Sequence, residues 1–226
     1  MAGVRYQDVA AAFELTGLSL RGGFGKPAQD APEGTLAVVL VGNAGADFWP
    51  AFEAGRRSEP DPMDAWTRRV VGPIADRLGA DAVYPSDRPY RPFQAWAQLA
   101  EPVTPSPLGI LIHPVYGLWH AYRAALLFPF ALEGIPARAQ APSPCVSCAA
   151  KPCLSACPVA AFDGTRYDVA ACAGHLKSCA PPDCANLGCR ARDACPVGPE
   201  WRYPQAQVRF HMDAFVRSRG GPWGAG

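Results

Sequence analysis

The chain has 226 residues, of which 18% are charged, and its formal net charge at neutral pH is +1. This length suits one large domain and one small one, and the balanced charge gives no electrostatic basis for binding nucleic acid or an anionic membrane. The longest apolar run, Ala124–Ala131, is far shorter than a membrane span requires.

Residues 1–136 are expected to form an α+β domain. Tyr6–Leu18 has helical periodicity. The glycine-rich segment Arg21–Lys26 fits no phosphate-binding pattern and is expected to be a turn. The near-continuous apolar run Thr35–Val41 is typical of a buried strand. A helix should begin at Asp61-Pro62, with the aspartate as N-cap, and should end at Gly79.

Shorter elements are predicted after this helix. We expect strands at Ala82–Tyr84 and Leu108–His113, and a helix from Leu118 to about Phe128. Ala137–Pro144 has two prolines and no periodicity, which is typical of a linker. Near the C-terminus, Gln205–Arg217 has helical spacing of its apolar residues. We expect that helix, within residues 203–226, to pack back on the first domain.

All nine cysteines lie between residues 145 and 195, and the tetrapeptide Ala-Cys-Pro-Val occurs twice among them. The first run is close to the bacterial ferredoxin spacing C-x2-C-x2-C-x3-C-P, except that its middle gap has four residues. Soft thiolates on one tight loop suit an iron–sulfur cubane. The pattern predicts a ferredoxin-like 4Fe-4S domain over residues 137–202.

In such domains the last thiolate of each run reaches across to the other cluster. This crossover logic predicts two 4Fe-4S clusters, although a single cluster remains open because the second run is irregular. Cys179 is the expected spare thiol, and Cys179 and Cys184 could exchange roles. The first cluster is assigned to Cys145, Cys148, Cys153 and Cys195, and the second to Cys157, Cys172, Cys184 and Cys189.

Two other interpretations of the cysteines are weaker. Structural zinc prefers two C-x2-C pairs, whereas only Cys145 and Cys148 have that spacing. A disulfide scaffold needs an oxidising compartment, yet residues 1–8 lack the pattern of a secretion signal, and nine is an odd number for pairing. The expected location is therefore the cytoplasm. Because the cysteine segment has few large apolar side chains, we expect it to need its clusters in order to fold.

A second pattern lies in the segment Ile112-His113-Pro114-Val115-Tyr116-Gly117-Leu118-Trp119. It resembles the I-H-P-x-[FY]-G-x-W stretch of CblC-type cobalamin-processing proteins. The resemblance covers roughly residues 1–135 and includes the Asp61-Pro62-Met63-Asp64 helix start and Pro89–Pro92. It implies a nitroreductase-like fold that binds cobalamin, with a flavin as the less favoured ligand.

Three residues carry over from that pattern as cofactor-binding candidates: His113, Tyr116 and Gly117. Gly117 would let the backbone approach a planar macrocycle. Tyr116 could stack or donate a proton, and His113 could bond a corrin amide or a water. The alternative is purely structural, with His113-Pro114 ending a strand and Gly117 forming the turn that follows.

The cysteine region in turn is similar to the ferredoxin-like part of epoxyqueuosine reductases and reductive dehalogenases, which follows a nitroreductase-like cobalamin domain. Together the resemblances imply an iron–sulfur oxidoreductase that relays electrons to a corrinoid or flavin. The alternative is a non-catalytic electron carrier or cobalamin chaperone. The expected partners are an electron donor or acceptor protein and a corrinoid, without nucleic acid or membrane.

Overall fold

The computed structural model describes residues 3–25, 31–178 and 184–219. Contacts within the chain divide it into two compact units. The first combines Met1–Val103 with His120–Ala141, and the second combines Thr104–Trp119 with Pro142–Gly226. The segment that carries the His113–Gly117 pattern therefore belongs to the same unit as the cysteines, although the sequence placed it in the first domain.

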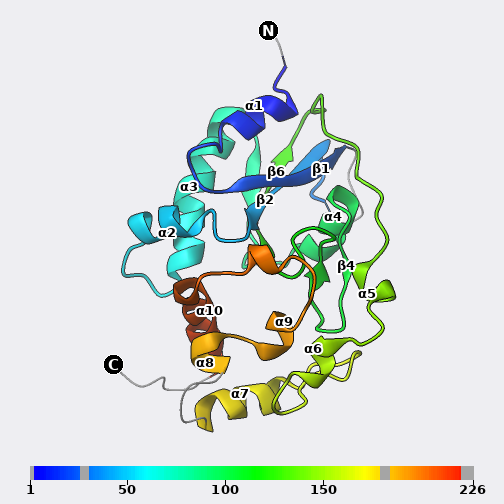
Figure 1. Ribbon diagram of the computed structural model, residues 1–226. Coiled ribbons are helices and arrows are strands. Elements are labelled where there is room, and N and C mark those ends of the chain that lie inside the picture. Colours follow the sequence, from blue (N-terminus) through cyan, green and yellow to red (C-terminus); the bar gives the residue numbers. More distant parts are fainter. Residues whose placement is uncertain (1–2, 26–30, 179–183, 220–226) are drawn as a thin grey trace. The chain divides into compact units, whose positions relative to one another are not determined.

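The first unit is built on a four-stranded sheet in the order β1-β2-β6-β3, and all neighbouring strands are antiparallel (Figure 1). Helix α3 contacts β3 and β6, and helix α4 contacts β1 and β2. With these helices the unit is α+β, as predicted. The strands are β1 (Ser19–Gly25), β2 (Ala37–Ala44), β3 (Asp81–Val83) and β6 (His120–Phe128).

The predicted buried strand is confirmed as β2, which begins two residues later than expected. It pairs with β1 on one side and β6 on the other, and Ala37–Asn43 are buried throughout. A strand that is central in a sheet and covered on both faces needs apolar side chains at every position. This requirement explains the continuous run of valine and leucine.

The helix predicted from Leu118 to Phe128 is wrong, because this segment contains strand β6. Ala124–Phe128 are all buried, and β6 pairs with both β2 and β3. A short apolar run without a polar face fits a central strand as well as a buried helix, so periodicity could not distinguish the two.

The expected turn at Arg21–Lys26 is also wrong over the described residues, since Ser19–Gly25 form β1. The register of β1 against β2 shifts between Leu20 and Gly23, which marks a bulge. Gly22 has a φ of 72°, and a Cβ there would lie 2.5 Å from the carbonyl oxygen of Ala100. The glycine therefore lets β1 approach the end of α4.

The helix predicted at Asp61-Pro62 is confirmed as α3, with proline at its first position and Gly79 at its end in the left-handed conformation. Asp61, however, makes no side-chain capping bond. Helix α1 stops well before Leu18, where the prediction ended. The helices of this unit are α1 (Tyr6–Ala11), α2 (Trp49–Gly55), α3 (Pro62–Leu78) and α4 (Phe93–Ala100).

The second unit consists mainly of short helices. Its only strands among the described residues are the pair β4 (Thr104–Pro105) and β5 (Leu111–Ile112). The predicted C-terminal helix is α10, which contacts α7 and α8 in this unit. None of the described helices is long and apolar enough to cross a membrane. The helices are α5 (Pro144–Ser147), α6 (Pro152–Ser155), α7 (Val169–Ser178), α8 (Cys184–Leu187), α9 (Arg190–Asp193), the 3-10 turn η1 (Pro199–Trp201) and α10 (Gln205–Ser218).

Candidate metal centre

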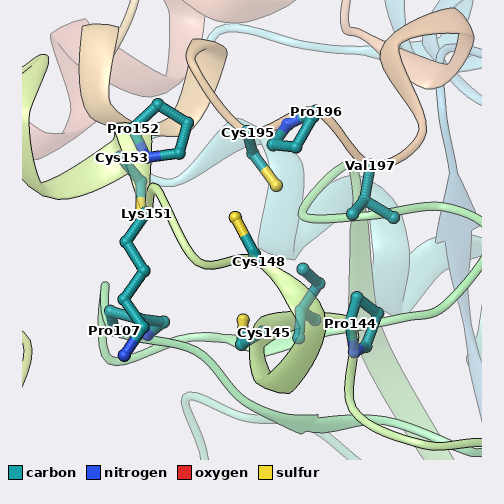
Figure 2. A pocket seen from close by; sticks show the side chains of 11 residues that line it. Pro107, Pro144, Cys145, Cys148, Lys151, Pro152, Cys153, Cys195, Pro196 and Val197 are labelled. Atoms are coloured by element: carbon teal, nitrogen blue, oxygen red, sulfur yellow. The ribbon is translucent and has the colours of Figure 1, made fainter.

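Four cysteines line one cavity in the second unit (Figure 2). Three come from α5, the turn after it and α6, and the fourth follows α9. Figure 2 shows the sulfur atoms of Cys148 and Cys195 pointing toward one another. Apart from Lys151, the other lining residues are apolar: Pro107, Ile112, Pro144, Pro152, Pro196 and Val197. The four cysteines are those that the sequence assigned to one cluster: Cys145, Cys148, Cys153 and Cys195.

The unusual four-residue gap between Cys148 and Cys153 contains a sharp turn. Lys151 has a φ of 39°, in the left-handed region that residues other than glycine seldom adopt. Pro152 follows at the first position of α6, where its fixed φ suits a helix start. The longer gap thus accommodates the turn that begins α6, and Cys153 returns to the cavity.

Electrostatic repulsion between their charged forms shifts the pKa values of thiols around this cavity. Burial raises the pKa of Cys145, and the charges of Cys195, Cys153 and Cys148 raise it further, while Lys151 opposes the shift. Burial likewise raises the pKa of Cys153, again with Cys195 and Cys148. Four crowded thiolates repel one another, so bound cations would relieve the repulsion and displace the protons.

The other four described cysteines form a second set of electrostatic neighbours. Burial raises the pKa of Cys172, and the charge of Cys157 adds to the shift. Burial also raises the pKa of Cys189, with contributions from Cys184 and Cys172. These electrostatic influences link Cys157, Cys172, Cys184 and Cys189 with one another.

Hydrogen-bond donors reach the sulfur atoms of this second set. The backbone N–H of Ala161 donates to Cys157 Sγ over 3.3 Å. The side chains of Tyr167 and Cys172 are hydrogen-bonded, and burial, followed by this bond, raises the pKa of Tyr167. Two backbone N–H groups of α9 bond to Cys189 and oppose its raised pKa. Donors to sulfur stabilise negative charge there and are one means of setting cluster potentials.

Both sets are embedded in apolar side chains. Leu108, Ile112, Leu118 and Phe162 belong to one buried group against which five of the cysteines pack. All eight described cysteines are free of disulfides, and Cys179 lies outside the described residues. In the part of the chain that is described, no three His, Cys, Asp or Glu residues are grouped so that they could hold a metal ion. The fit to iron–sulfur clusters therefore lies in the chemistry of the donors, which are soft thiols in apolar surroundings.

The three cofactor-binding candidates lie together in a tight turn. The backbones of His113 and Gly117 exchange two hydrogen bonds, each of 2.9 Å. His113 Nδ1 accepts from the backbone N–H groups of Val115 and Tyr116, at 3.1 and 3.2 Å. The rings of His113 and Tyr116 stack with centroids 4.3 Å apart. His113 is buried and Tyr116 is half-buried, so the structural interpretation accounts for the shape of the turn.

No known protein-family model matches the chain, and no curated protein matches it. Among solved structures, the C. elegans B12-trafficking protein CblC, a homologue of human MMACHC, aligns with 93% of this chain and 95% of its own, at 14% identity and a TM-score of 0.54. The fold is CblC-like. Coverage of 93% extends well beyond residue 136, so the likeness is not confined to the expected first domain.

Epoxyqueuosine reductases also match. One solved with a tRNA stem loop covers 76% of this chain at 15% identity and a TM-score of 0.48, and the Bacillus subtilis enzyme covers 80% at 14% identity and 0.47. The matches cover 51% and 56% of those two proteins, so the chain spans about half of their length. The CblC-like fold suspected from the sequence is confirmed by the likeness to CblC.

Sequence reasoning missed some contributors to the second set. Tyr167 lies five residues before Cys172, and this spacing belongs to no known ligand motif. An isolated β-bridge pairs Tyr167 with Phe162. The backbone donors of α9 depend on a short helix whose start could not be recognised from its charged sequence. The Cys-Pro endings predicted candidate ligands, but they could not predict which residues surround them.

Proposed function

We propose that the chain is an iron–sulfur redox protein with two 4Fe-4S clusters. The observation that carries the proposal is the separation of eight cysteines into two sets of four, one of which lines a single cavity. Two cubanes take eight thiolates, and the chain has nine cysteines, of which Cys179 is the expected spare. The first cluster would be held by Cys145, Cys148, Cys153 and Cys195, and the second by Cys157, Cys172, Cys184 and Cys189.

The protein's own contribution would be to shield the clusters and set their potentials. The apolar group around Leu108 and Phe162 limits access of water. Hydrogen bonds to Cys157 and Cys189 would stabilise the reduced, more negative state of a cluster held there and would therefore raise its reduction potential. The clusters, when bound, supply one-electron transfer.

As electron acceptor we propose a corrinoid, with a flavin as the second choice. The support is a CblC-like fold across nearly the whole chain. His113 and Tyr116 remain the residues proposed to contact the corrinoid. Tyr116 is half-buried, so part of its side chain is accessible to a ligand. Turnover would make the protein an oxidoreductase supplied by an electron donor protein. Thiols that bind clusters must stay reduced, which favours a cytoplasmic location.

The likeness to a B12-trafficking protein favours a second candidate, a cobalamin chaperone that delivers its cargo without turnover. One experiment separates the two. The cluster-loaded chain is reduced with dithionite, freed of excess reductant and mixed anaerobically with hydroxocobalamin, and the cobalamin spectrum is followed. Reduction of cobalamin in step with cluster oxidation supports the relay. Tight cobalamin binding with no change in either chromophore supports the chaperone.

A further inference from the structure

Two segments far apart in the chain lie against each other at backbone distance within the second unit. Gly117, with a φ of 55°, faces Val197, and a Cβ at Gly117 would overlap the carbonyl oxygen of Val197. Gly198, with a φ of 64°, faces the first segment in return. A Cβ there would lie 2.6 Å from the carbonyl oxygen of Val115 and 2.9 Å from the nitrogen of Gly117. Each glycine thus permits the approach of the other segment.

Cys195 lies directly before this contact, two residues ahead of Val197. The same stretch is fixed on its other side, because Arg192 Nη2 donates to the carbonyl oxygen of Leu118 over 2.6 Å. Beyond the glycine pair, the ring of Trp201 meets that of Tyr116 edge-on with centroids 4.7 Å apart. The segments before and after Cys195 therefore both contact residues 115–118, through the Arg192 side chain and through the backbone of Val197 and Gly198.

The other ligands of the first set have local support that Cys195 lacks. Cys145 and Cys153 lie in α5 and α6, which are joined by a short turn that also carries Cys148. Cys195 comes from a distant part of the sequence, after α9. Its distance from the cavity is set by contacts with other segments. Helix α9, just before Cys195, contacts α6, and the His113–Gly117 turn contacts the residues just after Cys195.

We propose that the His113–Gly117 turn is a positioning element for Cys195, and that Gly117 is the residue on which this positioning depends. The inference rests on the proposed function, because it assigns Cys195 to the first cluster. The stacked rings of His113 and Tyr116 and the bonds to His113 Nδ1 give the turn its shape. Gly117 then admits the carbonyl of Val197, which holds Cys195 at the cavity.

The test compares alanine substitutions at two glycines of the same segment. Gly117→Ala introduces both an unfavourable positive φ and an overlap with Val197. Gly109→Ala introduces a positive φ of 75° with nothing within 4 Å of the added Cβ, so it is the matched control. Cys195→Ala, which removes the ligand itself, is the reference. Each variant is loaded with clusters as the full chain under anaerobic conditions.

We expect Gly117→Ala to lose about half of the bound iron, as Cys195→Ala does, with the EPR signal of the second cluster retained. Gly109→Ala should keep the iron content and both signals of the unaltered chain. Trp201→Leu is the milder second variant: it keeps the backbone contact but removes the ring against Tyr116, and it should shift the midpoint potential of the first cluster only.

Unaltered iron content in Gly117→Ala would overturn the inference, and so would an unaltered midpoint potential of the first cluster in Trp201→Leu. So would the joint loss of both clusters in Gly117→Ala, since that outcome indicates a general role in folding. A parent chain that binds no iron would instead refute the proposed function. The two failures are therefore distinguishable.

Discussion

The buried ion pair between Arg21 and Glu101 should be a major determinant of stability in the first unit. The two side chains are 2% and 12% exposed, and Glu101 accepts two bonds of 2.9 Å from the guanidinium. The hydroxyl of Tyr122 donates to the same carboxylate over 2.7 Å. Glu101→Gln keeps the side-chain volume but leaves a buried cation without its counter-charge. Removing one partner of such a pair costs about 3–5 kcal/mol.

A second ion pair in the same unit provides the control. Arg69 and Glu59 are 28% and 30% exposed, and partly exposed pairs of this kind are worth about 0–1 kcal/mol after screening by solvent. Urea unfolding followed by far-UV circular dichroism measures both variants. With a slope of about 2 kcal/mol per molar urea, Glu101→Gln should lower the midpoint by roughly 2 M. A midpoint for Glu101→Gln equal to that of Glu59→Gln would refute this reasoning.

Two further predictions concern a tyrosine and a cluster ligand. Tyr122→Phe removes a hydrogen bond to a charged acceptor and should cost about 1.5–3 kcal/mol in the same assay. Burial, followed by the charge of Glu101, raises the pKa of Tyr122 in the folded chain. The unfolded chain therefore loses the tyrosine proton first, and the free energy of unfolding should fall above pH ~10. This fall should be less steep in Tyr122→Phe. Cys153→Ser should remove the first cluster and about half of the iron, measured by metal analysis, while Gly109→Ala leaves the iron unchanged.

The sequence was most informative where spacing alone determines chemistry. The two Cys-Pro endings led to the prediction of two sets of cluster ligands. The four thiols of the first set line one cavity, and their role as ligands stays a prediction. Strand β2 and helix α3 were also predictable, because their patterns of burial and their end residues are local.

Elements that depend on tertiary pairing were not predictable. The run Ala124–Phe128 is a strand only because β2 and β3 lie beside it. Gly117 illustrates the same limit at the site. Its lack of a side chain suggested room for a planar ligand, whereas the space is taken by the carbonyl of Val197, a residue far along the chain. No local pattern could have revealed that neighbour.

The most direct test of the central claim is the content of iron and acid-labile sulfide in the anaerobically purified chain, together with its absorption spectrum. Two clusters predict about eight iron atoms per chain and a broad absorption that bleaches with dithionite. Iron near four per chain would mean that one of the two sets of cysteines holds no cluster. A colourless protein that carries zinc, or no metal, would contradict the account.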